Sequence, residues 1–241
     1  MTVSLFITCL VDQFRPSVGT SMLRVFDRLG LACDFPAGQT CCGQPARNMG
    51  YEDEARRVGR QWLRAFAGAE VVVAPSGSCV AMVRHHLPAL FAEGSAERAE
   101  ADALAARTYE LSEFLVDVLG VHDVGASYPG RVTYHDSCHL RRELGVGDQP
   151  RRLLANVRGL ELVEMEAPDE CCGFGGLFAV KQPDISTAMG ASKLARAAPT
   201  GARAIVACDT GCLLHLGGLI ARRGDAIETL HLAEVLAARI R

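Results

Sequence analysis

The sequence has few of the features that mark secreted, membrane-spanning or nucleic-acid-binding proteins. No apolar stretch approaches the roughly 18 residues that a membrane-spanning helix needs. Residues 1–8 contain neither the basic segment nor the cleavage site of an export signal, and their pattern indicates a buried strand. The net charge is −3 and no long basic run occurs, which argues against nucleic acid as a partner. We therefore expect a cytoplasmic protein that is not an integral membrane protein.

Motifs for the common organic redox cofactors are also missing from the sequence. It contains no Gly-x-Gly-x-x-Gly fingerprint, which argues against a bound nicotinamide or flavin. The segment Gly173-Phe174-Gly175-Gly176 is glycine-rich but lacks the spacing and the Lys of a phosphate-binding loop. No residue set resembles a complete hydride-abstracting site. These absences suggest a protein that moves electrons or that contributes part of a shared site.

Cysteine, by contrast, is abundant, with 10 residues in a chain of 241. The expected compartment keeps thiols reduced, and a chain of this length can bury a core without disulfides. A scattered residue such as Cys33 fits the ordinary role of a buried apolar thiol. Two Cys-Cys-Gly triplets placed alike in the two halves of the chain do not fit that role.

The cysteine pattern repeats, which indicates an internal duplication. The first half carries Cys9, Cys41, Cys42 and Cys79, and the second half carries Cys138, Cys171, Cys172 and Cys212 at nearly the same spacing. Each half also closes on a similar apolar segment, at residues 111–115 and 232–236. Self-similarity of this kind is typical of two homologous units. We expect these units at residues 1–119 and 131–241, with a linker at 120–130.

Short apolar segments alternate with helical patterns in both units. Strands are predicted at residues 5–7, 71–74, 132–134 and 204–207, and helices at 17–29, 52–66, 148–157 and 183–194. Residues 92–106 have no counterpart in the second unit and indicate an inserted helix. The alternation predicts an α/β fold of two pseudo-symmetric βαβ-type halves, each a small, mostly parallel sheet flanked by helices. Because the cysteines follow strands, each set of four is expected to converge in a pocket at the strand ends.

The chemistry of thiolates limits what these sets can hold. Thiolates select zinc, copper(I) or iron–sulfur clusters. Structural zinc usually takes paired Cys-x₂₋₄-Cys knuckles, and neither half has one before its last cysteine. Adjacent cysteines flanked by glycine suit a cluster better, because neighbouring thiolates reach different irons and backbone N–H groups can donate to sulfur. We therefore predict that the eight repeated cysteines are cluster ligands, with zinc as the alternative.

Several motifs resemble those of the CCG cysteine-rich domain family, which includes the catalytic subunit of heterodisulfide reductase and the glycolate oxidase iron–sulfur subunit. Within that family the chain is most similar to the lactate-utilisation protein A group. The resemblance covers essentially the whole chain and rests on six segments: Cys41-Cys42-Gly43-Gln44-Pro45-Ala46, Pro75-Ser76-Gly77-Ser78-Cys79, Tyr134-His135-Asp136-Ser137-Cys138, Val157-Arg158-Gly159-Leu160-Glu161-Leu162, Cys171-Cys172-Gly173-Phe174-Gly175-Gly176 and Gly211-Cys212-Leu213-Leu214.

This resemblance implies an accessory iron–sulfur subunit of an L-lactate-oxidising complex, which converts L-lactate to pyruvate and passes electrons to partner subunits. It implies two partner proteins, one of them ferredoxin-like, and an oxidoreductase subunit that is active only in complex. The implied cofactor is the [4Fe–4S] cluster, up to two per chain, held by the eight repeated cysteines.

The chain departs from the wider family at one position in each half. The full family pattern ends in Cys-x-x-Cys, and such a five-thiolate set can bind a noncubane cluster in the heterodisulfide reductases. Here Ser76 and Asp209 take the place of the penultimate cysteine. Four thiolates suffice for an ordinary [4Fe–4S] cluster, so the departure argues against the noncubane cluster and disulfide cleavage. Cys208 is an alternative fifth ligand, but its position fits the last residue of a buried strand better.

Two histidines are further candidate site residues, and two alternative functions also fit the sequence. His135 and His139 flank Cys138 and are candidates for a catalytic or cluster-tuning role, although a capping or solvated role fits them too. A zinc–thiolate scaffold that docks partners is one alternative function. A thiol–disulfide oxidoreductase like the heterodisulfide reductases is the other.

Overall fold

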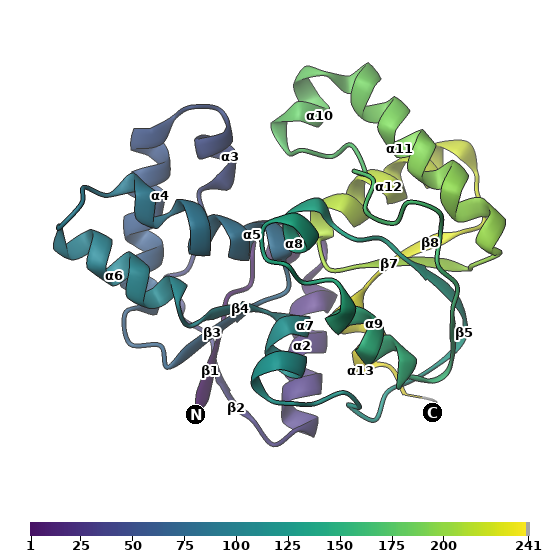
Figure 1. The fold of residues 1–241 in the computed structure, drawn as a ribbon, viewed down its shortest axis with the longest axis horizontal. Helices are drawn as coiled ribbons and strands as arrows, with labels where there is room; N and C mark the ends of the chain where they lie inside the picture. Colours follow the sequence, from purple (N-terminus) through teal and green to yellow (C-terminus); the bar gives the residue numbers. More distant parts are fainter. Residues whose placement is uncertain (240–241) are drawn as a thin grey trace.

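Two four-stranded parallel sheets, one from each half of the chain, form the frame of the computed structural model, which describes residues 1–239 (Figure 1). The first sheet has the order β2 (Ala32–Asp34), β1 (Thr2–Leu5), β3 (Val71–Ala74) and β4 (Thr108–Glu110). The second has the order β6 (Arg158–Leu162), β5 (Ser127–Tyr134), β7 (Ala204–Ala207) and β8 (Glu228–His231). The two orders are equivalent, and the predicted two-half α/β fold is confirmed.

Helices connect the strands, as parallel pairing requires. In the first half they are α1 (Cys9–Phe14), α2 (Pro16–Arg28), α3 (Gln44–Asn48), α4 (Glu52–Phe66), α5 (Gly77–Ala81), α6 (Ala96–Ala105) and α7 (Leu111–Glu113). In the second half they are α8 (Cys138–Arg142), α9 (Asp148–Ala155), α10 (Leu177–Lys181), α11 (Pro183–Ala197), α12 (Thr210–Arg223) and α13 (Leu232–Ala237). Short π-helical segments, Met82–His86 and Phe114–Val118, follow α5 and α7, and 3₁₀ turns lie at Pro88–Leu90 and Ala198–Thr200.

The predicted helices occur where the sequence pattern placed them. Proline occupies the first turn of α2 and of α11, where its missing N–H has no intrahelical partner to lose. The inserted helix expected within residues 92–106 is α6. Strand β5 begins at Ser127, inside the expected linker and before residue 131, because its N-terminal part pairs with β6 across a register shift. Residues 240 and 241 of the expected second unit lie outside the described residues.

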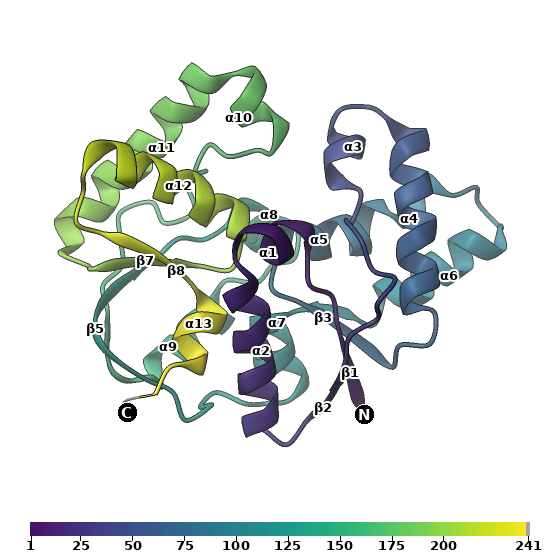
Figure 2. The same ribbon diagram turned by 180° about the vertical axis from the view of Figure 1, so that it is seen from behind.

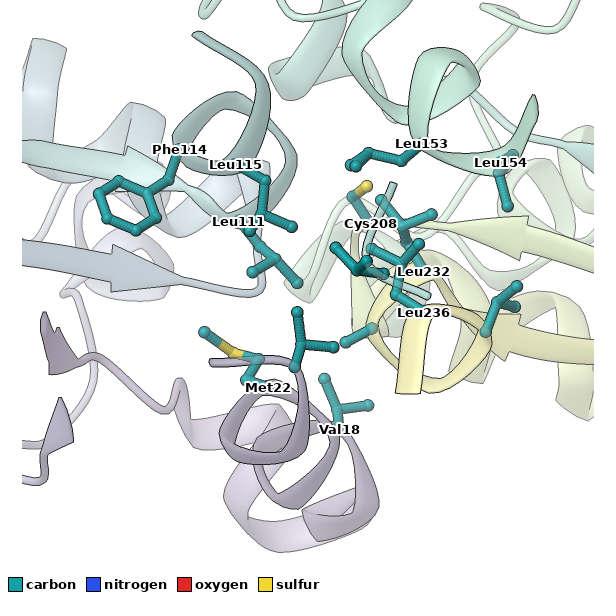
Figure 3. Close-up of a cluster of buried hydrophobic side chains, with 14 of the residues drawn as sticks. Val18, Met22, Leu111, Phe114, Leu115, Leu153, Leu154, Cys208, Leu232 and Leu236 are labelled. Atoms are coloured by element: carbon teal, nitrogen blue, oxygen red, sulfur yellow. The ribbon is translucent and has the colours of Figure 1, made fainter. Parts of the chain in front are cut away.

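One hydrophobic core extends across both halves. Helix α2 of the first half packs against α13 of the second, and both lie between the two sheets (Figure 2). In this core the side chains of Val18 and Met22 meet those of Leu232 and Leu236, and all four are completely buried (Figure 3). Each half also has a smaller apolar cluster of its own, under α4 in the first half and under α11 and α12 in the second. The halves therefore share their largest core.

The helices offer no candidate for a membrane span. Among those in residues 1–239, none is both long enough and apolar enough to cross a bilayer.

The shared core predicts that the two halves unfold together. Replacing the fully buried Leu232 with Ala should lower the free energy of unfolding by about 2–5 kcal/mol, because it leaves a cavity in the shared core. The chain has one tryptophan, Trp62, which is buried in the first half and reports on that half by fluorescence. We expect Leu232→Ala to shift the urea midpoint of the Trp62 signal and of circular dichroism equally. Ile185→Ala, at an exposed position, is the matched control. If Leu232→Ala does not change the urea midpoint of the Trp62 signal, the two halves do not unfold as one unit.

Candidate metal centre

All eight repeated cysteines line a single cavity of about 410 Å³ between the two halves. We expected one pocket in each half, whereas the structure joins the two sets around one space. Helices α3 and α10 stand on opposite sides of this region, and α5 and α8 lie side by side beneath it (Figures 1 and 2). The sets meet because the carboxyl ends of both parallel sheets point toward the same central region. The shared core beneath the cavity holds the two sheets in that orientation.

Each cysteine is placed by the strand or helix next to it, in the same way in both halves. Cys9 and Cys138 are the first residues of α1 and α8, which follow β1 and β5. Cys79 and Cys212 lie in the first turn of α5 and α12, which follow β3 and β7. The Cys-Cys pairs lie in the loops after β2 and β6. The three cysteine-bearing segments of each half therefore lie at strand ends, as the sequence predicts.

The glycine after each Cys-Cys pair has a specific geometric role. Gly43 and Gly173 have φ values of 89° and 91°, in the left-handed region that favours glycine. A Cβ atom on Gly173 would lie 2.5 Å from the carbonyl oxygen of Ser186, so α11 also requires glycine there. In both turns the glycine N–H donates to the sulfur two residues earlier, to Cys41 Sγ and Cys171 Sγ, at 3.4 Å. These turns supply the backbone-to-sulfur bonds that the sequence predicts.

Those two sulfurs are also the preferred thiolates of the site. Hydrogen bonds from the thiols of Cys42 and Cys9 lower the pKa of Cys41 well below its ordinary value. Cys9 Sγ lies 3.8 Å from Cys41 Sγ. The equivalent bonds, from the thiols of Cys138 and Cys172, lower the pKa of Cys171 in the same way. In the second half a hydrogen bond from the Cys172 thiol also lowers the pKa of Cys212, to about 6. Because the thiolate is the form that binds metals, each half presents at least one such ligand at neutral pH.

Ser76 and Asp209, the residues in place of the fifth cysteines, line the cavity and bond to each other across the two halves. Asp209 Oδ1 accepts from the hydroxyl groups of Ser76 at 2.9 Å and Ser78 at 2.8 Å, and from the Ser78 N–H at 3.1 Å. Ser76 also caps α5, because its Oγ accepts from the Cys79 N–H at 3.3 Å. Sequence reasoning missed Ser78, since its partner lies in the other half and no local pattern marks it.

The two candidate histidines occupy different environments. His139 lines the cavity, with Nδ1 at 3.6 Å from Cys138 Sγ and Nε2 at 3.5 Å from Glu143. His135 is completely buried, and a ring nitrogen lies within 4.8 Å of Cys172 Sγ and Cys212 Sγ. The structure therefore places both near the second cysteine set, His139 at the surface of the cavity and His135 behind it.

Two cysteines lie away from the cavity. Cys33 is on β2 and half-buried. Cys208 follows β7 in the shared core, where its sulfur lies 3.3 Å from the hydroxyl oxygen of Tyr134. Cys208 is therefore a buried residue directly after the strand, and the structure does not bring it to the other cysteines.

The residues around the cavity fit a thiolate-held metal group. Four sulfurs per half face one space, one sulfur of each set is held as a thiolate, and a backbone N–H already donates to it. Soft sulfur donors of this kind suit zinc or iron–sulfur clusters. The remaining lining is largely apolar, contributed by residues such as Leu10, Phe174, Leu177 and Val180. An apolar surrounding shields a metal group from water and influences its redox properties.

Comparison with known proteins agrees with this architecture. The CCG cysteine-rich domain matches the chain twice, at residues 3–84 and 132–217. A lactate utilization protein A of Geobacillus kaustophilus is 53% identical over 99% of this chain and 100% of its own length. The protein of the same name from Bacillus velezensis is 47% identical, with the same coverage of both chains. This chain belongs to the lactate utilization protein A family.

The fold of this family member is also similar to a solved structure. The crystal structure of a hypothetical protein from Helicobacter pylori matches 100% of this chain and 49% of that chain, with a TM-score of 0.67. The sequence identity is 10%, so the likeness concerns the fold alone.

The hydrogen bonds from Ser76 and Ser78 to Asp209 predict that two substitutions of Asp209 lower the stability by different amounts. Replacing Asp209 with Ala leaves two hydroxyl groups and one N–H without their acceptor, which should cost about 1–3 kcal/mol in the free energy of unfolding. Asp209→Asn keeps an acceptor oxygen and should lose less. Urea unfolding of the metal-free proteins measures both. Equal losses for the two variants would show that the hydrogen bonds do not hold the halves together.

Proposed function

We propose that the chain is the iron–sulfur redox subunit of an L-lactate-oxidising complex, in which it takes part in converting L-lactate to pyruvate and passes electrons to partner subunits. The observation that carries the proposal is the convergence of two matched sets of four cysteines on one cavity. The names of its full-length relatives support lactate as the substrate of the complex. We propose further that the ligands are Cys9, Cys41, Cys42 and Cys79 in one set and Cys138, Cys171, Cys172 and Cys212 in the other.

The repeated geometry supports a cluster in each set. A [4Fe–4S] cluster requires four thiolates from a small region, and each set supplies four sulfurs to the same cavity. Such a cluster accepts and donates one electron at a time. The Gly43 and Gly173 N–H groups, which donate to Cys41 and Cys171, would stabilise negative charge on these sulfurs. Two sites in one cavity would let the chain handle the pair of electrons that lactate oxidation releases.

The charges around the cavity support an electron-transfer role for this chain over a role in binding lactate. The ionisable groups of the lining, apart from His139, are the cysteine thiols and the Asp209 carboxyl group. The anionic forms of these groups repel the carboxylate of lactate. We therefore propose that lactate binds mainly through a partner subunit. The partners we propose are two further subunits of the lactate-utilisation system, one of them ferredoxin-like.

The cluster proposal predicts a specific effect of removing one ligand. Protein purified without oxygen should contain iron and acid-labile sulfide and absorb broadly in the visible range. Cys171→Ser should lower the iron and sulfide content by about half, because it disables one of two equal sites. It should also abolish growth on L-lactate of the organism that encodes the chain. Cys33→Ser is the matched control, because Cys33 lies on β2 outside the cavity.

Other outcomes of this experiment separate the alternatives. Colourless protein that contains zinc without sulfide would favour the zinc–thiolate scaffold and contradict the redox proposal. A Cys171→Ser variant that still supports growth on lactate at the wild-type rate would contradict it as well.

The anionic lining predicts that the isolated subunit binds lactate poorly. We expect titration calorimetry with L-lactate at about 1 mM to give no binding heat for the isolated chain, because the carboxylate meets like charge. The iron–sulfur-loaded chain should also oxidise lactate only after the partner subunits are added, as measured by pyruvate formation. Pyruvate formation by the isolated chain at the rate of the complete complex would show that the chain has a substrate site of its own.

A further inference from the structure

Phe6 and His135 occupy equivalent backbone positions in the two halves but carry different side chains. Phe6 directly follows β1 and His135 directly follows β5. The N–H of Phe6 donates to the Val73 carbonyl, and the N–H of His135 donates to the Val206 carbonyl, both at 2.9 Å. Both side chains are completely buried. The duplication therefore placed an aromatic hydrocarbon in one half and an imidazole in the other.

Phe6 has the environment expected of a buried apolar residue. Its ring contacts Trp62 and Phe66 edge-on, with centroid distances of 5.7 and 5.5 Å. Edge-to-face aromatic pairs of this kind stabilise a core beyond the area they bury. The first half thus uses this position for packing.

His135 lacks a polar partner in its buried site. Neither Nδ1 nor Nε2 makes a hydrogen bond to any atom of residues 1–239. Leaving a buried polar group without a partner costs about 1–3 kcal/mol, a cost that Phe at the same position would not incur. Because the first half fills the same place with Phe, packing alone does not account for a buried histidine here.

The groups nearest the ring are two sulfurs of the second cysteine set. A ring nitrogen of His135, Cys172 Sγ and Cys212 Sγ all lie within 4.8 Å of one another. The ring lies outside ordinary hydrogen-bond geometry to either sulfur, yet it is close enough to help lower the pKa of Cys212, after the larger effect of the Cys172 thiol. Metal–nitrogen bonds are about 2.0–2.1 Å long and metal–sulfur bonds about 2.3 Å, so small side-chain rotations allow these three atoms to share one metal ion.

The residue that replaces the fifth cysteine of this half has other partners. Asp209 Oδ1 already accepts three hydrogen bonds from Ser76 and Ser78 of the first half. Its Oδ1 therefore helps to join the halves, while its Oδ2 makes no hydrogen bond among residues 1–239. His135, at the end of β5, lies on the buried side of the same set.

We propose that His135 is a nitrogen ligand of the metal group held by Cys138, Cys171, Cys172 and Cys212. The proposal rests on the proposed function, since it requires that this set holds a metal group. It makes the second site a mixed nitrogen–sulfur site and leaves the first site with sulfur ligands alone. The imidazole is a neutral donor that the first site lacks, so the two sites should differ in reduction potential.

The direct test labels the ligand and leaves the protein sequence unchanged. The wild-type chain is produced with ¹⁵N-histidine, loaded with ferrous iron and sulfide without oxygen, and reduced so that its clusters are paramagnetic. Pulsed electron paramagnetic resonance should then detect a strongly coupled ¹⁵N nucleus, in place of the ¹⁴N coupling of the unlabelled protein. This readout does not depend on whether any variant folds.

Two variants assign the coupling to one residue. His135→Phe installs the residue that the first half carries at this position, and it should remove the histidine coupling. It should also shift the reduction potential of one of the two clusters and leave that of the other unchanged, while the iron content stays near the wild-type value. His139→Phe is the matched control for the coupling, because His139 lies beside Cys138 at the surface of the cavity, and it should keep the histidine coupling.

The outcomes separate this proposal from the function on which it rests. Protein that holds iron and sulfide but shows no histidine coupling overturns the ligand assignment and leaves the redox function standing. A coupling that persists in His135→Phe and disappears in His139→Phe also overturns it. Protein that binds no iron and sulfide overturns both proposals.

Discussion

The packing of α2 against α13 is the contact on which the candidate centre depends. It joins residues from opposite ends of the chain into one core that lies between the two sheets. Hydrogen bonds between the halves reinforce this contact. His231 donates from Nε2 to the carbonyl of Pro75 at 3.0 Å, and burial lowers the pKa of this histidine, so its ring stays neutral. Without this core, each sheet would still place its cysteines at strand ends, but the two sets would not face one cavity.

Negative charge is the second constraint on the site. Thiolates gathered in an apolar space are costly unless donors or cations compensate them. Part of the compensation is built into the backbone, because the Gly43 and Gly173 N–H groups point at Cys41 and Cys171 in both halves. A bound metal group would supply the rest. The same accumulation of negative charge makes the cavity a poor site for a carboxylate, in agreement with the electron-transfer role that we propose.

Duplication explains the frame of the molecule, and departures from symmetry explain its chemistry. Sheet order, cysteine placement and the glycine turns repeat in both halves. Ser76 and Asp209 do not repeat: a hydroxyl donor in one half faces a carboxylate acceptor in the other, and the pair forms a bond that two identical residues of either type would form less well. Phe6 and His135 differ in the same way. Both halves have the same fold. At single equivalent positions the side chains differ, and Phe6 packs in the core of the first half where the second half carries His135.

Much of the fold followed from the sequence by itself. Apolar segments before the cysteines, and proline at the start of α2 and α11, determined where strands and helices lie, because these are local properties of the chain. The repeated spacing placed all eight cysteines at the carboxyl ends of parallel strands, where the loops of one sheet gather.

Only the tertiary structure decided how the two sets relate. The single cavity and the bond between Ser76 and Asp209 depend on contacts between the halves. The placement of Cys208 against Tyr134 and the early start of β5 at Ser127, whose N–H donates to the Ala238 carbonyl, depend on contacts within the second half between segments far apart in the chain. Residues more than a hundred positions apart leave no periodic or local signal of such contacts, because which faces meet is settled by the packing of whole helices and sheets.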